Sequence, residues 1–358
     1  MRVLYVISTL GGGGAESQLC SYAIELKKQH PEIEFAICAI KSGGVFEKKL
    51  SENGIDYTVL NSTNIVKSVF ALRKLLKSYK PDVVHAHMFL SDIVSRYATV
   101  FTKCKLVSTH HGLGKWKNKL HIALDKLSKH RVDRFVMVSE QSMQIRLNRE
   151  KYPKEKTRVI FNGISDRFLM ESSKSIENPG SVVVGTIARM TDNKQINLML
   201  DAISEIKRKY PTVRYEIVGE GENYDRLVRQ AQELGIEDNV VFWGWQDDVL
   251  SITRNWHIFA LPSINEDLPV AMLECMAQGI VPVASTVGGI ITLLDENRNG
   301  VLCDSSDVHS FINAIVWLAE NGDKYNEMSE NCINIVKNRF LISANVENTL
   351  GMYQELFV

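Results

Sequence analysis

Two glutamates that are eight residues apart, Glu266 and Glu274, lie on either side of a predicted helix start. Pro269 suits a first helical position, where a missing N–H costs nothing, and Gly279 suits the residue that ends the helix. We therefore expect Glu266 in the loop before the helix and Glu274 about a turn and a half inside it. The free N–H groups and the positive dipole end of such a helix suit a phosphate.

The two carboxylates suit hydroxyl groups better than they suit a phosphate. Like charges repel, so carboxylates that flank a phosphate site are placed to accept hydrogen bonds from hydroxyls on either side of it. A nucleotide-diphosphate sugar has this layout, because ribose hydroxyls and sugar hydroxyls flank its diphosphate. The alternative is that Glu266 and Glu274 are ordinary solvent-exposed charges, as most charged residues are.

Two further segments could contact a diphosphate. Arg189 and Lys194 are five residues apart in a loop after an apolar run, where a guanidinium and an ammonium could clamp phosphate oxygens. The glycines at 11–14 follow the first apolar run and allow backbone to approach a ligand closely. Their spacing is not Gly-x-Gly-x-x-Gly, which argues against a dinucleotide site. A flexible turn is the alternative.

Four histidines end two apolar runs: His85 and His87 in one, His110 and His111 in the other. No carboxylate or thiolate accompanies them at the spacing of a zinc site, so we expect no metal. A histidine at a strand end is as often structural as functional, so both readings stay open for His85 and His87.

The elements that must position these residues are short apolar runs alternating with helical stretches. This alternation predicts an α/β protein with doubly wound parallel sheets, which bind ligands at the carboxyl ends of their strands. A polar stretch over 171–180 separates two such series. The runs occupy residues 3–8, 34–40, 57–60, 82–86, 105–109, 134–138 and 158–161, and then 182–187, 213–218, 240–243, 256–261, 281–284 and 301–303.

Composition bounds the class of protein. A chain of 358 residues with 45% apolar and 23% charged residues is typical of a soluble protein with two domains. No window approaches the roughly 20 apolar residues that span a bilayer. The six cysteines form no Cys-x-x-Cys pair, which fits a reducing, cytoplasmic location.

The net charge of zero hides a strong asymmetry. Residues 1–170 hold 28 Lys and Arg against 15 Asp and Glu, and the remainder hold 14 against 27. The first half is therefore expected to meet something anionic. The basic, partly apolar stretch from Lys115 to Lys129 is a candidate contact for an anionic membrane surface, and an ordinary solvated helix is the alternative. No groove-reading motif accompanies the charge, so nucleic acid is not expected.

Together these motifs resemble family 4 of the retaining glycosyltransferases, which have the GT-B architecture. Glu266 and Glu274 match the family's E-x7-E signature, and Gly288 and Gly289 follow in register. The resemblance runs in order from Gly13 to Gly300. It implies two tandem Rossmann-like domains facing across a cleft, with a terminal helix that returns to the first domain. The parts expected are an acceptor-binding domain over 1–165, a linker over 166–180, a nucleotide-sugar-binding domain over 181–340 and that helix over 341–358.

The resemblance also implies roles for individual residues. His111, which precedes Gly112, would bond the transferred sugar, and Arg189, Lys194 and Glu266 would complete the catalytic set. At Asp267 and Leu268 the chain departs from the family's usual Gly-Phe, which adds a charge and removes an aromatic ring. The residues expected to bind the nucleotide-sugar are Gly13, Gly14, Arg189, Lys194, Gly219, Trp245, Glu266, Leu268, Pro269, Val270 and Glu274.

The function implied is sugar transfer from a nucleotide-diphosphate sugar, for which we expect UDP, to a glycan acceptor. The charge asymmetry favours a lipid-linked glycan at the inner face of the plasma membrane, in the synthesis of a cell-surface polysaccharide or lipopolysaccharide. No cofactor or metal is expected. The rival readings are a non-hydrolysing nucleotide-sugar epimerase, which shares the architecture, and a nucleotide-sugar-binding protein that has lost transfer activity.

Overall fold

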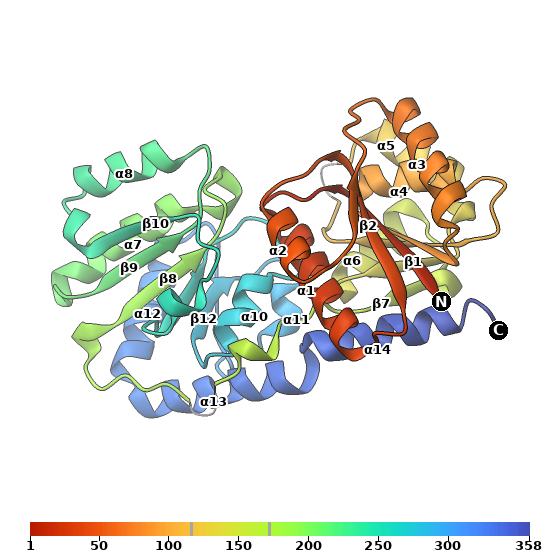
Figure 1. The fold of residues 1–358 in the computed structure, drawn as a ribbon. Helices are drawn as coiled ribbons and strands as arrows, with labels where there is room; N and C mark the ends of the chain where they lie inside the picture. The colour runs from red at the N-terminus through yellow and green to blue at the C-terminus, as the bar shows by residue number, and fades with distance from the viewer. Residues whose placement is uncertain (115–116, 171–172) are drawn as a thin grey trace. The chain divides into compact units, whose positions relative to one another are not determined.

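The computed structural model describes residues 1–114, 117–170 and 173–358, and they form two compact units. Unit 1 comprises Met1–Ser165 together with Leu341–Val358, and unit 2 comprises Asp166–Phe340. Each unit contains a wholly parallel sheet covered by helices (Figure 1). The predicted α/β class with two doubly wound sheets is confirmed.

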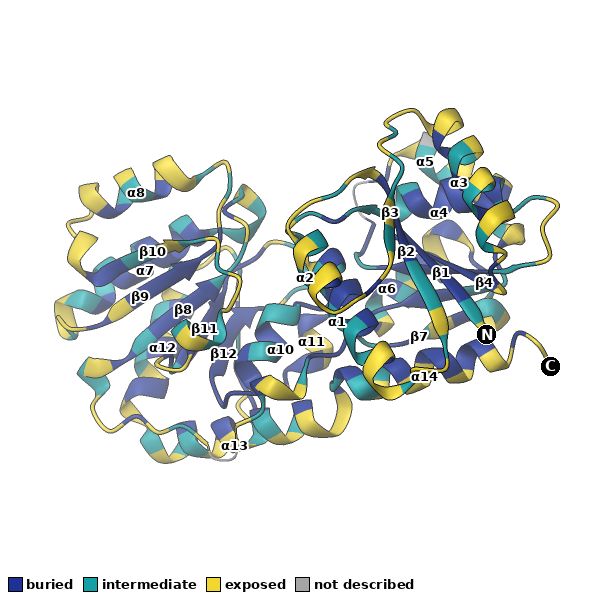
Figure 2. Cartoon of the chain, in the orientation of Figure 1, coloured by how far each residue is buried: buried dark blue, intermediate teal, exposed yellow. Residues whose placement is uncertain are grey.

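The sheet of unit 1 has seven strands in the order β3-β2-β1-β4-β5-β6-β7. The chain reverses its direction of travel across the sheet between β1 and β4, and ligands bind beside such a point in open α/β sheets. Both faces of the central strands are buried, as their continuous apolar runs predict (Figure 2). The strands are β1 (Arg2–Thr9), β2 (Glu34–Ser42), β3 (Tyr57–Val59), β4 (Val83–His87), β5 (Lys105–His110), β6 (Arg134–Met137) and β7 (Thr157–Val159).

Two helices from opposite ends of the chain cover one face of this sheet. These are α1 (Gly14–Gln29) and α14 (Ile342–Gln354), whose buried side chains share one core with Tyr5 and Val83 of the sheet. The chain leaves unit 1 after Ser165 and returns to it at Leu341. The two crossing points are adjacent, because the Ile342 N–H donates to the carbonyl oxygen of Ile164 at 2.8 Å. The remaining helices of unit 1 are α2 (Phe46–Glu52), α3 (Ile65–Tyr79), α4 (Phe89–Ala98), α5 (Lys119–Ser128) and α6 (Glu140–Ile145), which continues as a π-helical turn (Arg146–Glu150).

Unit 2 repeats the architecture with six strands in the order β10-β9-β8-β11-β12-β13. They are β8 (Val183–Ile187), β9 (Arg214–Val218), β10 (Val240–Gly244), β11 (Ile258–Leu261), β12 (Val281–Ser285) and β13 (Val301–Cys303). The helices are α7 (Ile196–Lys209), α8 (Tyr224–Glu233), α9 (Leu250–Thr253), α10 (Val270–Met276), α11 (Ile290–Leu293), α12 (Val308–Glu320) and α13 (Gly322–Arg339).

The segment expected as a linker, 166–180, belongs to unit 2 as far as it is described. Ile176 lies in the main hydrophobic core of that unit, and the Met170 N–H donates to the Ala277 carbonyl oxygen at 3.0 Å. The polar composition hid this anchoring, because a single isoleucine and backbone hydrogen bonds hold the segment in place.

Candidate functional site

The predicted donor-binding residues of unit 2 all follow the carboxyl ends of its strands. Arg189 and Lys194 follow β8, Gly219 follows β9 and Trp245 follows β10. The segment 262–274, which contains both glutamates, follows β11. Parallel strands bring these loops to the same edge of the sheet, so residues up to 85 positions apart in sequence share one site region.

An ion pair joins the two loops that carry most of the expected chemistry. The Lys194 ammonium contacts the Glu266 carboxylate, and both side chains are largely buried, with 22% and 11% of their surface exposed. Backbone reinforces this pair, because the Ile264 N–H donates to the Asn193 carbonyl oxygen at 2.9 Å. The Asn193 amide also donates to the Asn265 carbonyl oxygen at 3.1 Å. The loops after β8 and β11 are therefore fixed to one another.

Arg189 differs from Lys194 in having no protein anion beside it. Its side chain is exposed and makes no ion pair or hydrogen bond with any residue that the structure describes. A guanidinium has five N–H donors in a planar fork that matches phosphate oxygens. Arg189 is thus a cation at the strand edge whose donors remain available to a ligand.

Two glycines at this edge lie so close to neighbouring backbone that a side chain would not fit. Gly288 has φ +58°, and a Cβ there would collide with the carbonyl oxygen of Glu266. Gly219 has φ +128°, and a Cβ there would collide with the carbonyl oxygen of Ala188. Any side chain at these two positions would displace the backbone beside Glu266 or Arg189.

Helix α10 begins at Val270, so Pro269 is its N-cap rather than its first helical residue. Gly279 follows the helix with φ +72°, as expected of a terminating glycine. Leu268 and Asp267 are each only 6% exposed, so this departure from the family pattern lies inside the loop rather than on its surface. Glu274 is partly buried within α10, on the same segment as Glu266.

Trp245, expected near the nucleotide base, is 40% exposed at the end of β10. Its backbone N–H donates to Glu220 Oε1 at 3.4 Å, and its indole N–H donates to Asp247 Oδ1 at 3.2 Å. The indole is therefore held at the strand edge with much of its ring accessible.

In unit 1 the expected glycines stand at the beginning of α1. Gly13 is the N-cap and Gly14 is the first helical residue. Glu16 is buried two residues later and accepts a hydrogen bond from Thr9 Oγ1 at 2.7 Å. This contact ties the end of β1 to the first turn of α1, so the loop that bears the glycines is fixed at both ends.

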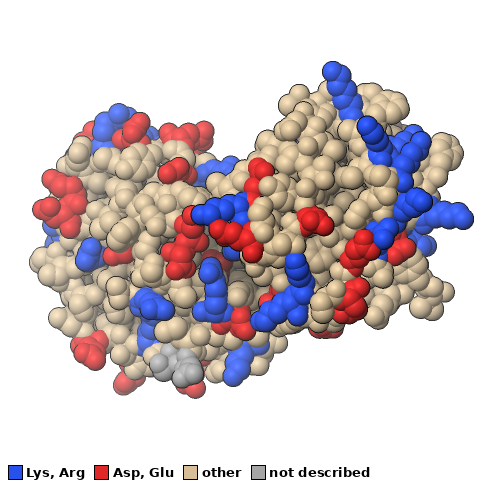
Figure 3. Space-filling model, viewed as in Figure 1, with Lys and Arg blue, Asp and Glu red and all other residues tan. Residues whose placement is uncertain are grey.

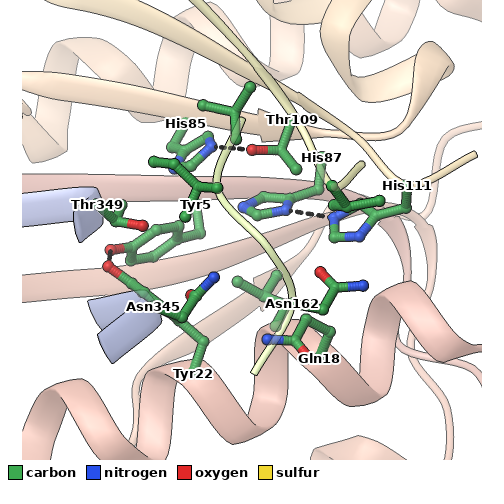
Figure 4. A pocket seen from close by; sticks show the side chains of 14 residues that line it. Tyr5, Gln18, Tyr22, His85, His87, Thr109, His111, Asn162, Asn345 and Thr349 are labelled. Carbon is green, nitrogen blue, oxygen red and sulfur yellow. Dashed lines mark hydrogen bonds between the residues drawn. The ribbon is translucent and has the colours of Figure 1, made fainter. Parts of the chain in front are cut away.

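Three of the four histidines form a column over the same sheet face (Figure 4). His85 and His87 point to one side of β4, since side chains alternate along a strand, and their ring centroids are 4.4 Å apart. His111 follows β5, and its centroid is 5.2 Å from that of His87. His87 Nδ1 and His111 Nε2 are hydrogen-bonded at 2.9 Å. His110 alternates to the other face, where its ring packs against Tyr152.

The column lines a cavity of about 30 Å³, enough for about one water molecule. His85 bonds through both ring nitrogens, one to the hydroxyl of Tyr353 on α14 and the other to Thr109 Oγ1 at 2.6 Å. Burial lowers the pKa of His85 to about 3, lowers that of His87 well below its usual value, and lowers that of His111 to about 4. All three rings are consequently neutral at pH 7.

On the opposite face of this sheet, six charged side chains form a fully buried network. Arg96 contacts Asp125 at 2.6 Å, and Lys117 contacts Asp125 at 2.8 Å and Glu150 at 3.0 Å. Each of these side chains is at most 3% exposed. Three cations balance three carboxylates, which removes the cost of an uncompensated buried charge. The members are Asp92, Arg96, Lys117, Asp125, Arg146 and Glu150.

Burial alone would raise the pKa of Asp125, but the charges of Arg96 and Lys117 outweigh it and hold that pKa well below its usual range. The network also braces the loop after His111. Arg146 Nη2 donates to the Gly112 carbonyl oxygen at 2.9 Å, and neighbouring Arg149 donates to the Gly114 carbonyl oxygen at 3.2 Å.

The network overturns one expectation about the basic stretch from Lys115 to Lys129. Lys117 is 2% exposed and its ammonium lies between two carboxylates, so it cannot contact a membrane. Lys115 falls outside the described residues. Lys119 and Lys126 are exposed on α5, together with Leu127, which is 70% exposed.

Sequence reasoning missed the network and the contribution of α14 to the histidine column. The pairs Asp92–Arg96 and Arg146–Glu150 have the four-residue spacing of helical ion pairs, which was the available signal. That spacing is equally common on solvated faces, so it could not predict burial. Among the described residues no group of three or more His, Cys, Asp or Glu side chains could hold a metal ion.

Comparison with known proteins places this architecture. The profile of the family "Glycosyltransferase Family 4" matches residues 12–168, and that of "Glycosyl transferases group 1" matches residues 170–335. Among solved structures, Anabaena HepE in complex with UDP-glucose superposes with a TM-score of 0.87 at 20% identity, over 99% of this chain and 100% of that one. Sucrose-phosphate synthase from Thermosynechococcus elongatus superposes with a TM-score of 0.83 at 18% identity, over 100% and 99% of the two chains.

Two relatives of assigned activity cover most of the chain. The UDP-Gal:alpha-D-GlcNAc-diphosphoundecaprenol alpha-1,3-galactosyltransferase of Escherichia coli is 27% identical over 82% of this chain and 80% of its own length. The GalNAc-alpha-(1->4)-GalNAc-alpha-(1->3)-diNAcBac-PP-undecaprenol alpha-1,4-N-acetyl-D-galactosaminyltransferase of Campylobacter jejuni is 26% identical over 86% of each chain. With a family profile matched in each half and the same fold throughout, the chain belongs to the family 4 glycosyltransferases of GT-B fold.

Proposed function

We propose that the protein is a retaining glycosyltransferase that moves a sugar from a UDP-sugar to a glycan carried on a lipid diphosphate. The observation that carries this proposal is the Lys194–Glu266 ion pair at the carboxyl edge of the unit 2 sheet, where Arg189 also lies and has no ionic partner among the described residues. The loops after β8 and β11 thus carry two cations that can bind a diphosphate and a carboxylate that can accept hydrogen bonds from sugar hydroxyls.

The residues divide the work between charge and orientation. Arg189 and Lys194 offset the negative charge that grows on the diphosphate as it leaves, an effect that often dominates such catalysis. Glu266 and Glu274 accept hydrogen bonds from donor hydroxyls, and His111 bonds the transferred sugar. We propose displacement on one face of the sugar, in which the departing phosphate helps to deprotonate the acceptor, without a metal and without a covalent carboxylate nucleophile.

The donor is the part of the proposal that is quickest to test. The Escherichia coli relative is named for UDP-Gal, and the superposed Anabaena HepE structure contains UDP-glucose, which supports UDP here. Nucleotide release should be measured across UDP-, GDP- and ADP-sugars, with and without acceptor. Glu266→Gln should cripple turnover, whereas Glu274→Gln should mainly raise the donor KM. A preference for a GDP-sugar would refute the choice of UDP and leave the chemistry standing.

The acceptor proposal rests on two relatives and on charge. Both relatives of assigned activity are named for acceptors on diphosphoundecaprenol or PP-undecaprenol. Unit 1 has exposed Lys and Arg side chains where α3 lies (Figure 3), and α5 presents Lys119, Lys126 and Leu127 outward. We propose that α5 meets an anionic membrane surface, which places the protein at the inner face of the membrane. No described helix has the length and apolarity to cross a bilayer.

A nucleotide-sugar epimerase remains the second candidate, because it uses the same architecture. It would change the configuration at the sugar's C2 without any acceptor. Incubating the protein with a UDP-sugar alone and analysing the recovered sugar by NMR separates the two functions. An epimerised sugar would overturn the transferase proposal.

A further inference from the structure

His87 is the only member of the histidine column that touches both other members. Its ring stacks on His85 on one side and contacts His111 through the Nδ1···Nε2 hydrogen bond of 2.9 Å on the other (Figure 4). His85 cannot replace it, because Tyr353 and Thr109 already occupy both of its ring nitrogens. The two outer nitrogens of the pair, His87 Nε2 and His111 Nδ1, are buried and have no partner among the described residues.

Counting protons links the two rings. Each ring is neutral and carries one N–H, since burial lowers the pKa of both imidazoles. The bond between them contains one proton, so either His87 Nδ1 donates or His111 Nε2 donates. In the first case the other proton lies on His111 Nδ1, and in the second it lies on His87 Nε2. Both rings therefore have the same tautomer, protonated at Nδ1 in one state and at Nε2 in the other.

We propose that His87 is a positioning residue, which orients the His111 ring and determines whether His111 Nδ1 presents a proton or a lone pair. This inference rests on the proposed function, in which His111 bonds the transferred sugar. His87 reaches this result through His111 alone and need not touch the sugar.

The other groups that line the cavity determine which tautomer the two rings adopt. Whatever group meets His87 Nε2 fixes the tautomer of both rings, because a donor there requires a lone pair on Nε2 and hence N–H on both Nδ1 atoms. The cavity wall contains groups that can donate or accept, including Asn162 and the α14 residues Asn345 and Thr349. Of the two histidines that contact His87, only His111 shares a hydrogen bond with it.

The first test needs no substrate. Long-range ¹H–¹⁵N spectra of the full-length protein labelled at histidine report the tautomer of each ring at pH 7.5. We expect His87 and His111 to share one tautomer, and we expect His87→Phe to release His111 into a mixture of the two. Opposite tautomers in the wild type, or an unchanged His111 tautomer in His87→Phe, would overturn the proposal whatever reaction the protein catalyses.

The second test is a double-mutant cycle on UDP release from whichever of UDP-galactose, UDP-glucose and UDP-N-acetylglucosamine turns over fastest. His87→Phe, which keeps the stacked ring, should lower kcat about tenfold or more at a nearly constant donor KM, the effect of a misaligned catalytic contact. His87→Asn places an amide atom near the former Nδ1 and should recover part of this loss. In a His111→Ala background, His87→Phe should cost less than about twofold.

The matched control is His85→Phe, which removes an equally buried imidazole that has no bond to His111. It should lower thermal stability at least as much as His87→Phe and leave kcat within about threefold. Equal losses of kcat in both variants, or a full tenfold loss on top of His111→Ala, would show that His87 acts through general packing and would refute the proposal. If none of the three UDP-sugars releases UDP, the proposed UDP donor fails, and the NMR test still decides the tautomer coupling.

Discussion

The two units treat charge in opposite ways. Unit 1 buries six charged side chains in one balanced network and neutralises three stacked histidines by burial. Unit 2 keeps its expected catalytic cations at the strand edge, with Lys194 partly exposed and Arg189 exposed. The first arrangement fixes geometry before any ligand arrives, whereas the second leaves the charge of Arg189 for a ligand to neutralise.

Because of this difference, we expect mutations of charged residues to lower stability in unit 1 and activity in unit 2. Removing one partner from a buried ion network leaves a charge that neither water nor protein compensates, so the loss appears in stability. Removing an exposed cation from a ligand site costs the fold little, so the loss appears in binding and turnover. The following predictions test this division.

The largest effect is expected for Lys117→Met, which leaves Asp125 and Glu150 without their shared ammonium. The free energy of unfolding should fall by about 3–5 kcal/mol. Urea unfolding followed by circular dichroism measures the loss, and tryptophan fluorescence separates the units, because four of the five tryptophans lie in unit 2. Lys126→Met on exposed α5 is the control, expected within about 0.5 kcal/mol of wild type. Equal stability of the two variants would contradict the network's role.

In unit 2, Arg189→Ala should remove activity and spare the fold, whereas Lys194→Ala should remove activity and also lower stability, because it leaves the Glu266 carboxylate without its ion pair. Each deletes a charge-assisted contact to the diphosphate worth about 1.5–3 kcal/mol, or roughly a 10- to 150-fold loss in kcat/KM. Steady-state UDP release measures the loss, and thermal melting of Arg189→Ala should stay near wild type. Arg208→Ala, which removes another exposed arginine of the same unit, should change neither quantity. Unchanged kinetics in either site variant would refute its assignment.

Acid should destabilise unit 1 through its neutral histidines. The pKa of His85 falls from about 6.5 in the unfolded chain to about 3 in the folded one, so the unfolded state binds more protons below pH 6.5. Stability is full above pH 6.5 and falls by about 1.4 kcal/mol per pH unit for each such histidine. Urea titrations between pH 5 and 7 should give a shallower slope for His85→Gln and an unchanged slope for exposed His309→Gln. Equal slopes in all three proteins would contradict the burial argument.

The smallest effect concerns the surface of α5. Each exposed lysine there adds about 1 kcal/mol of attraction to an anionic leaflet, and the attraction fades within a Debye length. Sedimentation with phosphatidylserine vesicles should therefore detect wild-type binding at low salt and its loss at high salt. Lys119→Glu with Lys126→Glu should abolish it, whereas the matched pair Arg208→Glu with Lys337→Glu in unit 2 should retain it. Absence of wild-type binding at low salt would favour a soluble acceptor.

Sequence reasoning predicted most of the fold because the signals are local. All thirteen predicted strand runs are strands. The sequence could also predict that Lys194 and Glu266 lie at one edge of the sheet, because the loops that follow parallel strands share that edge. Local patterns do not show which strands lie next to each other in a sheet. The histidine column depends on the pairing of β4 with β5, where His87 lies opposite Thr109.

The charge network was beyond sequence reasoning for a different physical reason. Lys117 and Glu150 are 33 positions apart, and nothing in the sequence indicates that they pair. A lysine in a basic stretch is usually solvated, so the pattern favoured a surface contact. Only the tertiary fold brings Asp125 and Glu150 to that ammonium and makes its burial favourable.

The return of α14 to unit 1 bears on how the protein is synthesised. Domains usually complete in the order in which the ribosome makes them. Here unit 2 has its whole sequence once Phe340 has emerged, whereas the unit that starts the chain still lacks the helix that supplies Tyr353 to His85. A nascent chain can therefore complete its second unit first, and the part of the first sheet's face that α14 covers stays exposed until α14 has been made.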